Sequence, residues 1–323
     1  MVEKAQKSPK KIVYSEGEEE KIIRAANSVV IQNIGVPILL GKKEVIENKI
    51  KELEYNVSDF EIVDPDKCEK CEKYTEEFYK MRQRKGITLR SARDLMKNNN
   101  YYGSMMVHMG DADALISGLT SHYPETIRPA LQTVGVKEGI DIVSGLYIVI
   151  AKRKVYFFAD TTVNYEPTAE QLAEIAICSA DMVKEFDIEP KIAMLSFSNF
   201  GSAIHPESVK VRKAVEIVNS TRPDLIIDGE MQADTAVVPE ILEKEFPFSK
   251  IKGGANVLIF PNLSSGNIAY KLFERLTDAK VIGPVLMGMK KPIHVLQRGA
   301  TVDDIINMSA IAVVGARSNS TKN

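Results

Sequence analysis

Short β-branched runs alternate with amphipathic stretches along almost the whole of this chain. The runs at 11–14 (KIVY), 37–41 (PILLG) and 155–160 (VYFFAD) are apolar over most of their length, and residues 18–32 and 169–186, which follow such runs, carry apolar side chains at helical spacing. Strands that are apolar on both faces are typical of parallel sheets covered by helices on both sides. The alternation therefore predicts an α/β fold with mostly parallel sheets and three αβα layers.

The number of expected strands predicts two domains, because it exceeds what one compact open sheet usually carries, and 323 residues are long for a single core. A β-rich stretch at 141–158 has the character of a hairpin. We expect a discontinuous first domain, residues 1–139 with 288–323, and a second domain, residues 140–287. The first eleven and last seven residues are expected to be disordered from their composition. The other runs expected to form strands are 61–64, 112–117, 192–196, 225–228 and 257–260.

The charge balance excludes several classes of function. Lys plus Arg number 42 and Asp plus Glu number 44, which gives a net charge of −2. Such a chain has no overall attraction for nucleic acid or for a membrane surface. No apolar run approaches the ~20 residues that span a bilayer, no secretory signal opens the chain, and three cysteines make no disulfide framework. We expect a cytoplasmic protein that holds any anionic ligand by a local cluster.

Two expected strands lead into similar loops that open helices. Ser198 and Ser202 lie between the run 192–196 and a helix opened by Pro206, and Ser264 and Asn267 follow the run at 257–260. Hydroxyls and backbone N–H groups at the carboxyl end of a strand are suited to phosphate. Helix capping by serine is the alternative for either loop.

Three arginines are candidates for binding an anion. Arg82 belongs to the basic run 81–86 (MRQRKG), Arg128 lies near a helix start, and Arg298 follows a strand-like run directly. A guanidinium suits the oxygens of a phosphate or an acyl phosphate. For any one of these arginines, a solvated surface position is the alternative.

Other motifs argue against several kinds of site. The chain has no Walker A sequence, no G-x-G-x-x-G and no G-x-S-x-G. Cys68 and Cys71 form a single C-x-x-C, and their charged surroundings favour a chance pair over a metal or redox site. The four histidines show no ligand spacing, so no metal site is expected.

Several motifs, occurring in order, carry a resemblance to a known family. They include 110–118 (GDADALISG), 126–132 (TIRPALQ), 228–234 (DGEMQAD) and 256–271 (NVLIFPNLSSGNIAYK). Together they resemble the signatures of the phosphate acetyltransferases, or phosphotransacetylases. The resemblance runs from about residue 11 to residue 316, nearly the whole chain.

The resemblance implies a homodimer whose interdomain cleft binds coenzyme A and acetyl phosphate. In that family the CoA thiolate attacks the acetyl carbonyl and phosphate leaves, with an aspartate as base and arginines holding the phosphate and the carbonyl. By motif match the base is Asp304, and the arginines are Arg298, Arg82 and Arg128. The two serine-containing loops would then hold phosphate groups of the CoA through Ser198, Ser202, Ser264 and Asn267.

One departure favours a relative of these enzymes. The family usually has serine before the last arginine, and here Gln297 precedes Arg298. The segments 105–110, 119–126 and 288–299 are similar to the C-terminal domain of large bacterial NADP-dependent malic enzymes. We therefore expect a domain that binds acetyl-CoA and regulates oxidative decarboxylation of malate, with acetyl transfer weak or absent.

On this interpretation the sequence is a piece of a longer chain, and NADP and a divalent metal bind only in the malic enzyme domains outside it. The alternative is an active phosphate acetyltransferase that converts acetyl phosphate and CoA to acetyl-CoA and phosphate. Retention of Arg82, Arg128, Arg298 and Asp304 supports this alternative, because a domain that only binds acetyl-CoA does not need a base.

Overall fold

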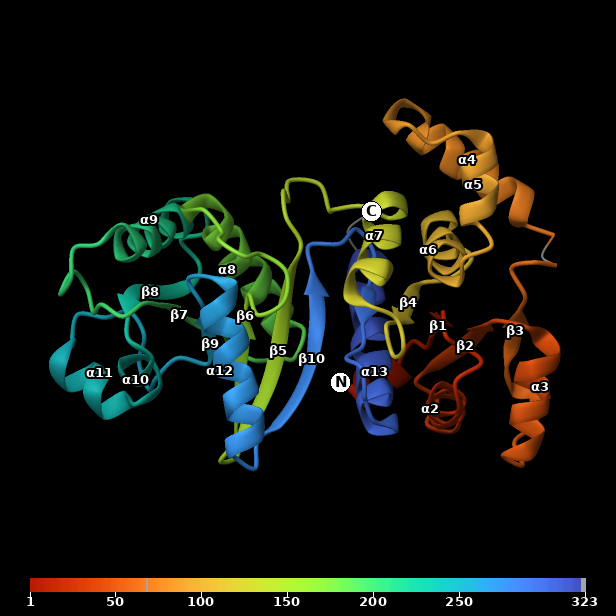
Figure 1. Ribbon diagram of the computed structural model, residues 1–323. Helices are drawn as coiled ribbons and strands as arrows, with labels where there is room; N and C mark the ends of the chain where they lie inside the picture. Colours follow the sequence, from red (N-terminus) through yellow and green to blue (C-terminus); the bar gives the residue numbers. More distant parts are fainter. Residues whose placement is uncertain (68, 321–323) are drawn as a thin grey trace. The chain divides into compact units, whose positions relative to one another are not determined.

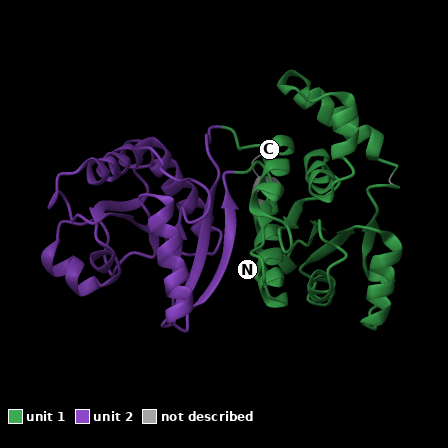
Figure 2. Cartoon of the chain, in the orientation of Figure 1, with its two compact units in different colours: residues 1–138, 289–323 green, residues 139–288 purple. Residues whose placement is uncertain are grey.

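A computed structural model describes residues 1–67 and 69–320. The chain divides into two compact units, unit 1 with residues Met1–Glu138 and Met289–Asn323, and unit 2 with residues Gly139–Gly288 (Figure 2). Each unit is built on one sheet that is wholly or largely parallel. The predicted α/β class with two mostly parallel sheets is confirmed.

The sheet of unit 1 has five strands in the order β11-β4-β1-β2-β3, and all of its strand pairs are parallel. Apolar side chains on both faces of β1 and β4 are buried, as continuous apolar runs predict. Because the strands are parallel, their carboxyl ends lie at one edge of the sheet. The strands are β1 Lys10–Tyr14, β2 Gly35–Leu40, β3 Glu61–Val63, β4 Ala114–Ser117 and β11 Ile293–Val295.

Helices cover both faces of this sheet. Helices α2 and α13 pack together on one side, and α6 lies on the side opposite α2 (Figure 1). A Cβ on Gly103 of α6 would come within 2.9 Å of Leu115, so α6 packs closely on β4. The helices of unit 1 are α1 Val2–Gln6, α2 Glu20–Ile31, α3 Lys43–Glu52, α4 Cys71–Arg82, α5 Leu89–Leu95, α6 Asn99–Met109, α7 Tyr123–Thr133 and α13 Val302–Ser320, with the 3-10 turns η1 Val57–Asp59 and η2 Gln83–Lys85.

The prediction of disorder at the N-terminus is wrong. Residues 2–6 form helix α1, which packs on α13 and buries Ala5 completely. A hydrogen bond from the guanidinium of Arg317 to the backbone carbonyl of Lys4 ties the two helices together. Composition misled here because the contacts that dock the helix, burial of Ala5 and the bond from Arg317, are made with a helix at the other end of the chain. Residues 317–320, also expected to be disordered, belong to α13, and residues 321–323 lie outside the described residues.

Unit 2 has a six-stranded sheet in the order β10-β5-β6-β9-β7-β8. Strands β6, β9, β7 and β8 are parallel, whereas β5 is antiparallel to both of its neighbours. The predicted hairpin at 141–158 is confirmed, and Lys152 and Arg153 form its tight turn with positive φ angles. The strands are β5 Ser144–Ala151, β6 Lys154–Ala159, β7 Lys191–Leu195, β8 Ile226–Met231, β9 Val257–Ile259 and β10 Lys280–Met287.

Helices α8 and α9 cover one face of this sheet, and α10 and α12 cover the other. The core beneath α12 is aromatic, with the rings of Tyr147 and Tyr270 stacked at 4.1 Å and Phe158 packed against Phe260. None of the helices in the described ranges is both long enough and apolar enough to cross a membrane. The helices of unit 2 are α8 Ala169–Lys184, α9 Pro206–Thr221, α10 Ala233–Val237, α11 Pro239–Glu245 and α12 Leu263–Leu276.

Candidate functional site

The carboxyl edge of the sheet in unit 1 carries two of the predicted catalytic residues. Gln297 and Arg298 follow β11, and a bond of 3.1 Å from the Ala300 N–H to the Gln297 carbonyl closes the turn that holds them. Arg298 is exposed and makes no ion pair or side-chain hydrogen bond with any described residue. Its guanidinium is therefore available to a ligand at the end of the strand.

Asp304 lies in the first turn of the next helix, α13, and its carboxylate is held on one side only. Oδ2 accepts hydrogen bonds from the N–H and hydroxyl of Thr301 at 2.9 and 2.7 Å, and the Asp304 N–H donates back to the Thr301 hydroxyl. This reciprocal pair caps the helix. No hydrogen bond from a described residue reaches Oδ1, so one carboxylate oxygen is fixed while the other can accept a proton.

The predicted arginines Arg82 and Arg128 both lie near Tyr101 on α6. Burial raises the pKa of Tyr101, and the positive charges of Arg128 and Arg82 act in the opposite direction, so each guanidinium lies within electrostatic reach of the Tyr101 hydroxyl. The Tyr101 hydroxyl donates to Gln132 at 2.8 Å. Arg82 ends α4, and its Nε is buried without a hydrogen-bond partner in the described part of the chain. Two guanidinium groups arranged in this way suit a phosphate dianion.

The four predicted residues of unit 2 share one edge of its sheet. Ser198 and Ser202 follow β7, while Ser264 and Asn267 lie in the first turns of α12, directly after the neighbouring strand β9. The Asn267 amide donates to the Thr161 carbonyl at 3.2 Å, which ties α12 to the loop after β6. Ser264 is exposed.

Neither Ser202 nor Ser264 is the N-cap of the helix that follows it. The N-cap of α12 is Asn262, whose side chain accepts from the Ser265 N–H at 2.9 Å. The N-cap of α9 is His205, whose Nδ1 accepts from the Glu207 N–H. The hydroxyls of Ser202 and Ser264 therefore have no capping role.

A buried carboxylate, which the sequence reasoning missed, organises the Ser198 loop. The side chain of Glu230 is fully buried and accepts from the Ser198 hydroxyl at 3.0 Å and from the Gly201 N–H at 2.8 Å. Arg212 donates to both of its oxygens at 3.0 Å. Burial alone would raise the pKa of Glu230, but these hydrogen bonds outweigh burial and lower it. Ser198 thus shapes the loop, and Ser202 is its exposed hydroxyl.

Two further carboxylates, which the sequence did not predict, organise loops at other strand ends by accepting hydrogen bonds from backbone N–H groups. Asp160 follows β6 and accepts from the backbone N–H groups of Gly145, Thr162, Val163 and Asn164 at 2.8 to 3.2 Å. Glu16 lies two residues after β1 and accepts from the loop after β4. All of these carboxylates stand at or just after a strand end.

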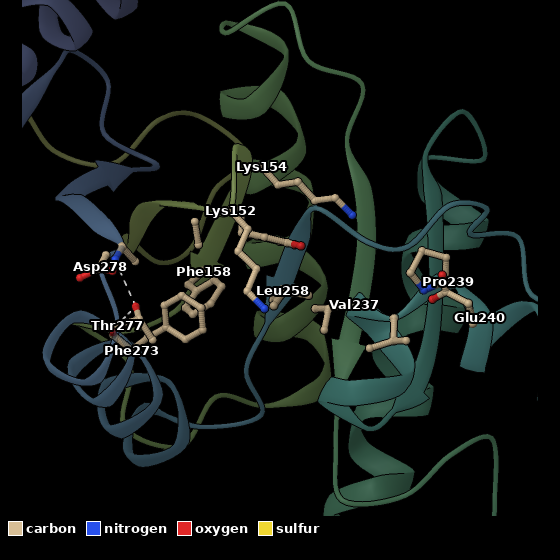
Figure 3. A pocket seen from close by; sticks show the side chains of 14 residues that line it. Lys152, Lys154, Phe158, Val237, Pro239, Glu240, Leu258, Phe273, Thr277 and Asp278 are labelled. Atoms are coloured by element: carbon tan, nitrogen blue, oxygen red, sulfur yellow. Dashed lines mark hydrogen bonds between the residues drawn. The ribbon is translucent and has the colours of Figure 1, made fainter.

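Unit 2 also has a pocket of about 820 Å³ at the opposite end of the strands, between the β5–β6 turn and the end of α12 (Figure 3). Its floor is apolar, and two lysines and two acidic residues line it as well, so it has no net charge. None of the predicted site residues lines it. The residues in Figure 3 include Lys152, Lys154, Phe158, Val237, Glu240, Leu258, Phe273 and Asp278.

The single C-x-x-C offers no support for a metal centre. Cys68 lies outside the described residues, and the Cys71 thiol donates to the Pro65 carbonyl at 2.8 Å. Over residues 1–67 and 69–320, no three or more His, Cys, Asp or Glu side chains are grouped in a way that could hold a metal ion.

Comparison with known proteins identifies close relatives. The family model described as phosphate acetyl/butaryl transferase matches residues 1–313. A phosphate acetyltransferase of Thermoanaerobacterium thermosaccharolyticum is 44% identical over 324 positions, covering 98% of each chain. The crystal structure of a phosphotransacetylase from Streptococcus pyogenes is 40% identical with a TM-score of 0.94, covering 98% of this chain and 97% of that one.

A protein of different name also matches. The NADP-dependent malic enzyme of Escherichia coli is 40% identical over 318 residues, which make up 97% of this chain but only 42% of that protein.

Proposed function

The chain belongs to the phosphate acetyl/butaryl transferase family, and we propose that it is a phosphate acetyltransferase that converts acetyl phosphate and CoA to acetyl-CoA and phosphate. The observation that carries this proposal is the match, at 44% identity, to a phosphate acetyltransferase along 98% of both chains. Enzyme relatives without further domains thus account for the whole sequence, which favours this function over the regulatory domain expected from Gln297.

The acyl phosphate is assigned to unit 1. Arg82 and Arg128 would hold the phosphate oxygens beside the Tyr101 hydroxyl, and Arg298 would polarise the acetyl carbonyl. The open oxygen of Asp304 would take the proton from the CoA thiol. The thiolate then forms the new C–S bond, the carbon–oxygen bond to the phosphoryl group breaks, and inorganic phosphate leaves with that electron pair.

The CoA phosphates are assigned to the carboxyl edge of unit 2. Ser202 and Ser264 present exposed hydroxyls there, and Asn267 is held nearby by its bond to Thr161. CoA is a substrate in the reaction proposed for this family member, and the proposal includes no further cofactor and no metal. The cytoplasmic location expected from the sequence is part of this proposal.

A homodimer is also proposed, and helix α12 supports it. Ile268, Leu272 and Leu276 follow one another at four-residue spacing and are 58%, 53% and 77% exposed. Side chains at this spacing form one apolar stripe on a helix, and a second copy of the chain would cover it. Light scattering of the wild type and Leu272→Lys tests this, since the substitution should produce monomers.

A regulatory acetyl-CoA-binding domain is the second candidate, and the similarity to a malic enzyme at 40% identity favours it. Gln297 also favours it, because the family usually has serine there. The two candidates differ in turnover. Only the transferase forms thioester rapidly, whereas both bind acetyl-CoA.

The decisive experiment follows thioester formation from acetyl phosphate and CoA. We expect robust turnover by the wild type and a loss of about 10²–10³-fold in Arg298→Ala, the usual effect of removing one donor to a transition state. Arg153→Ala is the matched control, because Arg153 is an exposed arginine in the β5–β6 turn, at the other end of the strands. Wild-type protein that binds acetyl-CoA without turnover would instead favour the regulatory domain, and a rate restored in Gln297→Ser would identify the cause.

A further inference from the structure

Glu16 holds one short loop of unit 1 through an unusually complete set of hydrogen bonds. Its Oε2 accepts from the backbone N–H groups of Gly118 and Leu119 at 2.9 and 2.7 Å. Its Oε1 accepts from both the N–H and the hydroxyl of Thr120, each at 2.8 Å, and of Ser121, each at 3.1 Å. Four successive backbone N–H groups thus converge on one carboxylate.

This loop connects the two parts of unit 1 to which the reaction is assigned. It follows β4 and leads directly into α7, the helix that carries Arg128. It also packs on the end of β11, because a Cβ on Gly118 would come within 2.7 Å of Val295 and 3.0 Å of the Leu296 carbonyl. A further bond of 2.6 Å joins the Leu296 N–H to the Ser117 carbonyl. Arg298 follows two residues after Leu296.

Successive N–H groups that point to one spot form a concave site for an anion. If the anion is absent, the partial positive charges repel one another and the donors lack acceptors, so the loop must rearrange. In this protein the anion is the chain's own Glu16 carboxylate.

We propose that Glu16 is a positioning residue for acetyl transfer, an internal carboxylate that fixes residues 118–121 and so sets Arg128 and Arg298 for the acyl phosphate. This inference rests on the proposed function. It predicts that loss of Glu16 impairs the use of acetyl phosphate more than the use of CoA, because the CoA loops belong to unit 2. It also predicts that a small free carboxylate can occupy the vacated place.

The test compares steady-state kinetics of the wild type and Glu16→Ala, with and without formate. We expect kcat/KM for acetyl phosphate to fall about 10²-fold, the effect of a misplacement near 1 Å, with the KM for CoA unchanged. Formate should raise the kcat/KM of Glu16→Ala for acetyl phosphate at least tenfold. Glu19→Ala is the matched control, since Glu19 is a carboxylate of the same segment whose side chain makes no capping bond, and its kinetics should be wild-type with no response to formate.

Several results would overturn the inference. They are wild-type kinetics in Glu16→Ala, an equal rise in the KM for both substrates, or a loss that formate does not reduce. Should Glu16→Ala fail to fold, Ser121→Ala serves instead, because it removes one of the six donors. That variant must raise the KM for acetyl phosphate about 2–10-fold, the size of one hydrogen bond, and an unchanged KM refutes the positioning role.

Failure of the proposed function gives a different pattern. If the wild type forms no thioester at all, the proposed function fails, and the loop is then tested by thermal unfolding. Formate should raise the melting temperature of Glu16→Ala and leave those of the wild type and Glu19→Ala unchanged. If formate has no effect on Glu16→Ala, residues 118–121 do not form an anion site and the inference falls as well.

Discussion

Replacing Arg212 with alanine should destabilise unit 2, because the buried carboxylate of Glu230 would lose its charged partner. The fully buried carboxylate of Glu230 would keep its bonds from Ser198 and Gly201 but lose both bonds from the guanidinium. A hydrogen bond to a charged group contributes about 1.5–3 kcal/mol. Since the Arg212 side chain is 40% exposed, water compensates for part of the lost hydrogen bonding. We therefore expect the free energy of unfolding to fall by about 2 kcal/mol. For a unit of this size that lowers the melting temperature by roughly 4–8 °C.

The effect of this substitution should depend on pH in a defined direction. The folded-state pKa of Glu230 is lowered from the ordinary value of 4.5. Its contribution to stability is therefore complete above pH 4.5 and is lost as the pH falls through the lowered pKa. The gap between the wild type and Arg212→Ala should be widest at neutral pH and should narrow below pH 4.5.

Denaturant unfolding at pH 7 and pH 4 measures this gap, and amide hydrogen exchange at Gly201 reports the loop locally. Lys213→Ala is the matched control, because Lys213 is the next residue of the same helix and pairs with Glu170 at 2.6 Å in an exposed bridge. Such bridges contribute about 0–1 kcal/mol. Equal losses in the two variants, or a gap that does not change with pH, would refute the reasoning.

Three further predictions concern a buried histidine, a glycine of α12 and the pair of cysteines. Burial lowers the pKa of His294 to about 4. Below pH 6.5 the unfolded state therefore binds a proton that the folded state does not, and the free energy of unfolding should fall by up to about 3 kcal/mol towards pH 4. Denaturant titrations of His294→Gln should show a free energy of unfolding that depends less on pH. A Cβ on Gly266 would lie 2.5 Å from the Asp160 carbonyl, so Gly266→Ala should cost about 1–3 kcal/mol in thermal unfolding, and an unchanged melting temperature would contradict this close approach. The Cys68–Cys71 pair should be chemically idle, so stoichiometric zinc in elemental analysis after dialysis would be evidence against this prediction.

Most strands of the parallel sheets were predicted because burial on both faces leaves a clear signal, whereas β10, an edge strand antiparallel to β5, was not predicted. The apolar run at 155–160 and the hairpin turn after residue 151 were both found. The end of β8 was not found. The expected strand ended at residue 228, whereas β8 continues through Gly229 and Glu230 to Met231. Those residue types usually mark a turn, and here tertiary hydrogen bonds to Arg212 and to the neighbouring loop hold a carboxylate within the strand.

The candidate site was predictable only in part, and for a related reason. Arg298 stands directly after a strand, so its place followed from topology. That Arg82 and Arg128 both come near Tyr101 depends on how α4, α6 and α7 pack, which no local pattern encodes. The partners of Glu16 likewise come from a loop more than one hundred residues further along the chain.

The division of unit 1 into two sequence segments has a consequence for biosynthesis. Tyr14 on β1 shares a buried hydrogen bond with Ser309 on α13, and 295 residues separate the two. At a translation rate of 5–20 residues per second, the apolar face of β1 stays uncovered for roughly 15–60 s, until α13 has been synthesised. Unit 2 is contiguous and can fold on the ribosome during that interval. The half-finished unit 1, with its exposed parallel strands, is thus the nascent state that chaperones would have to protect.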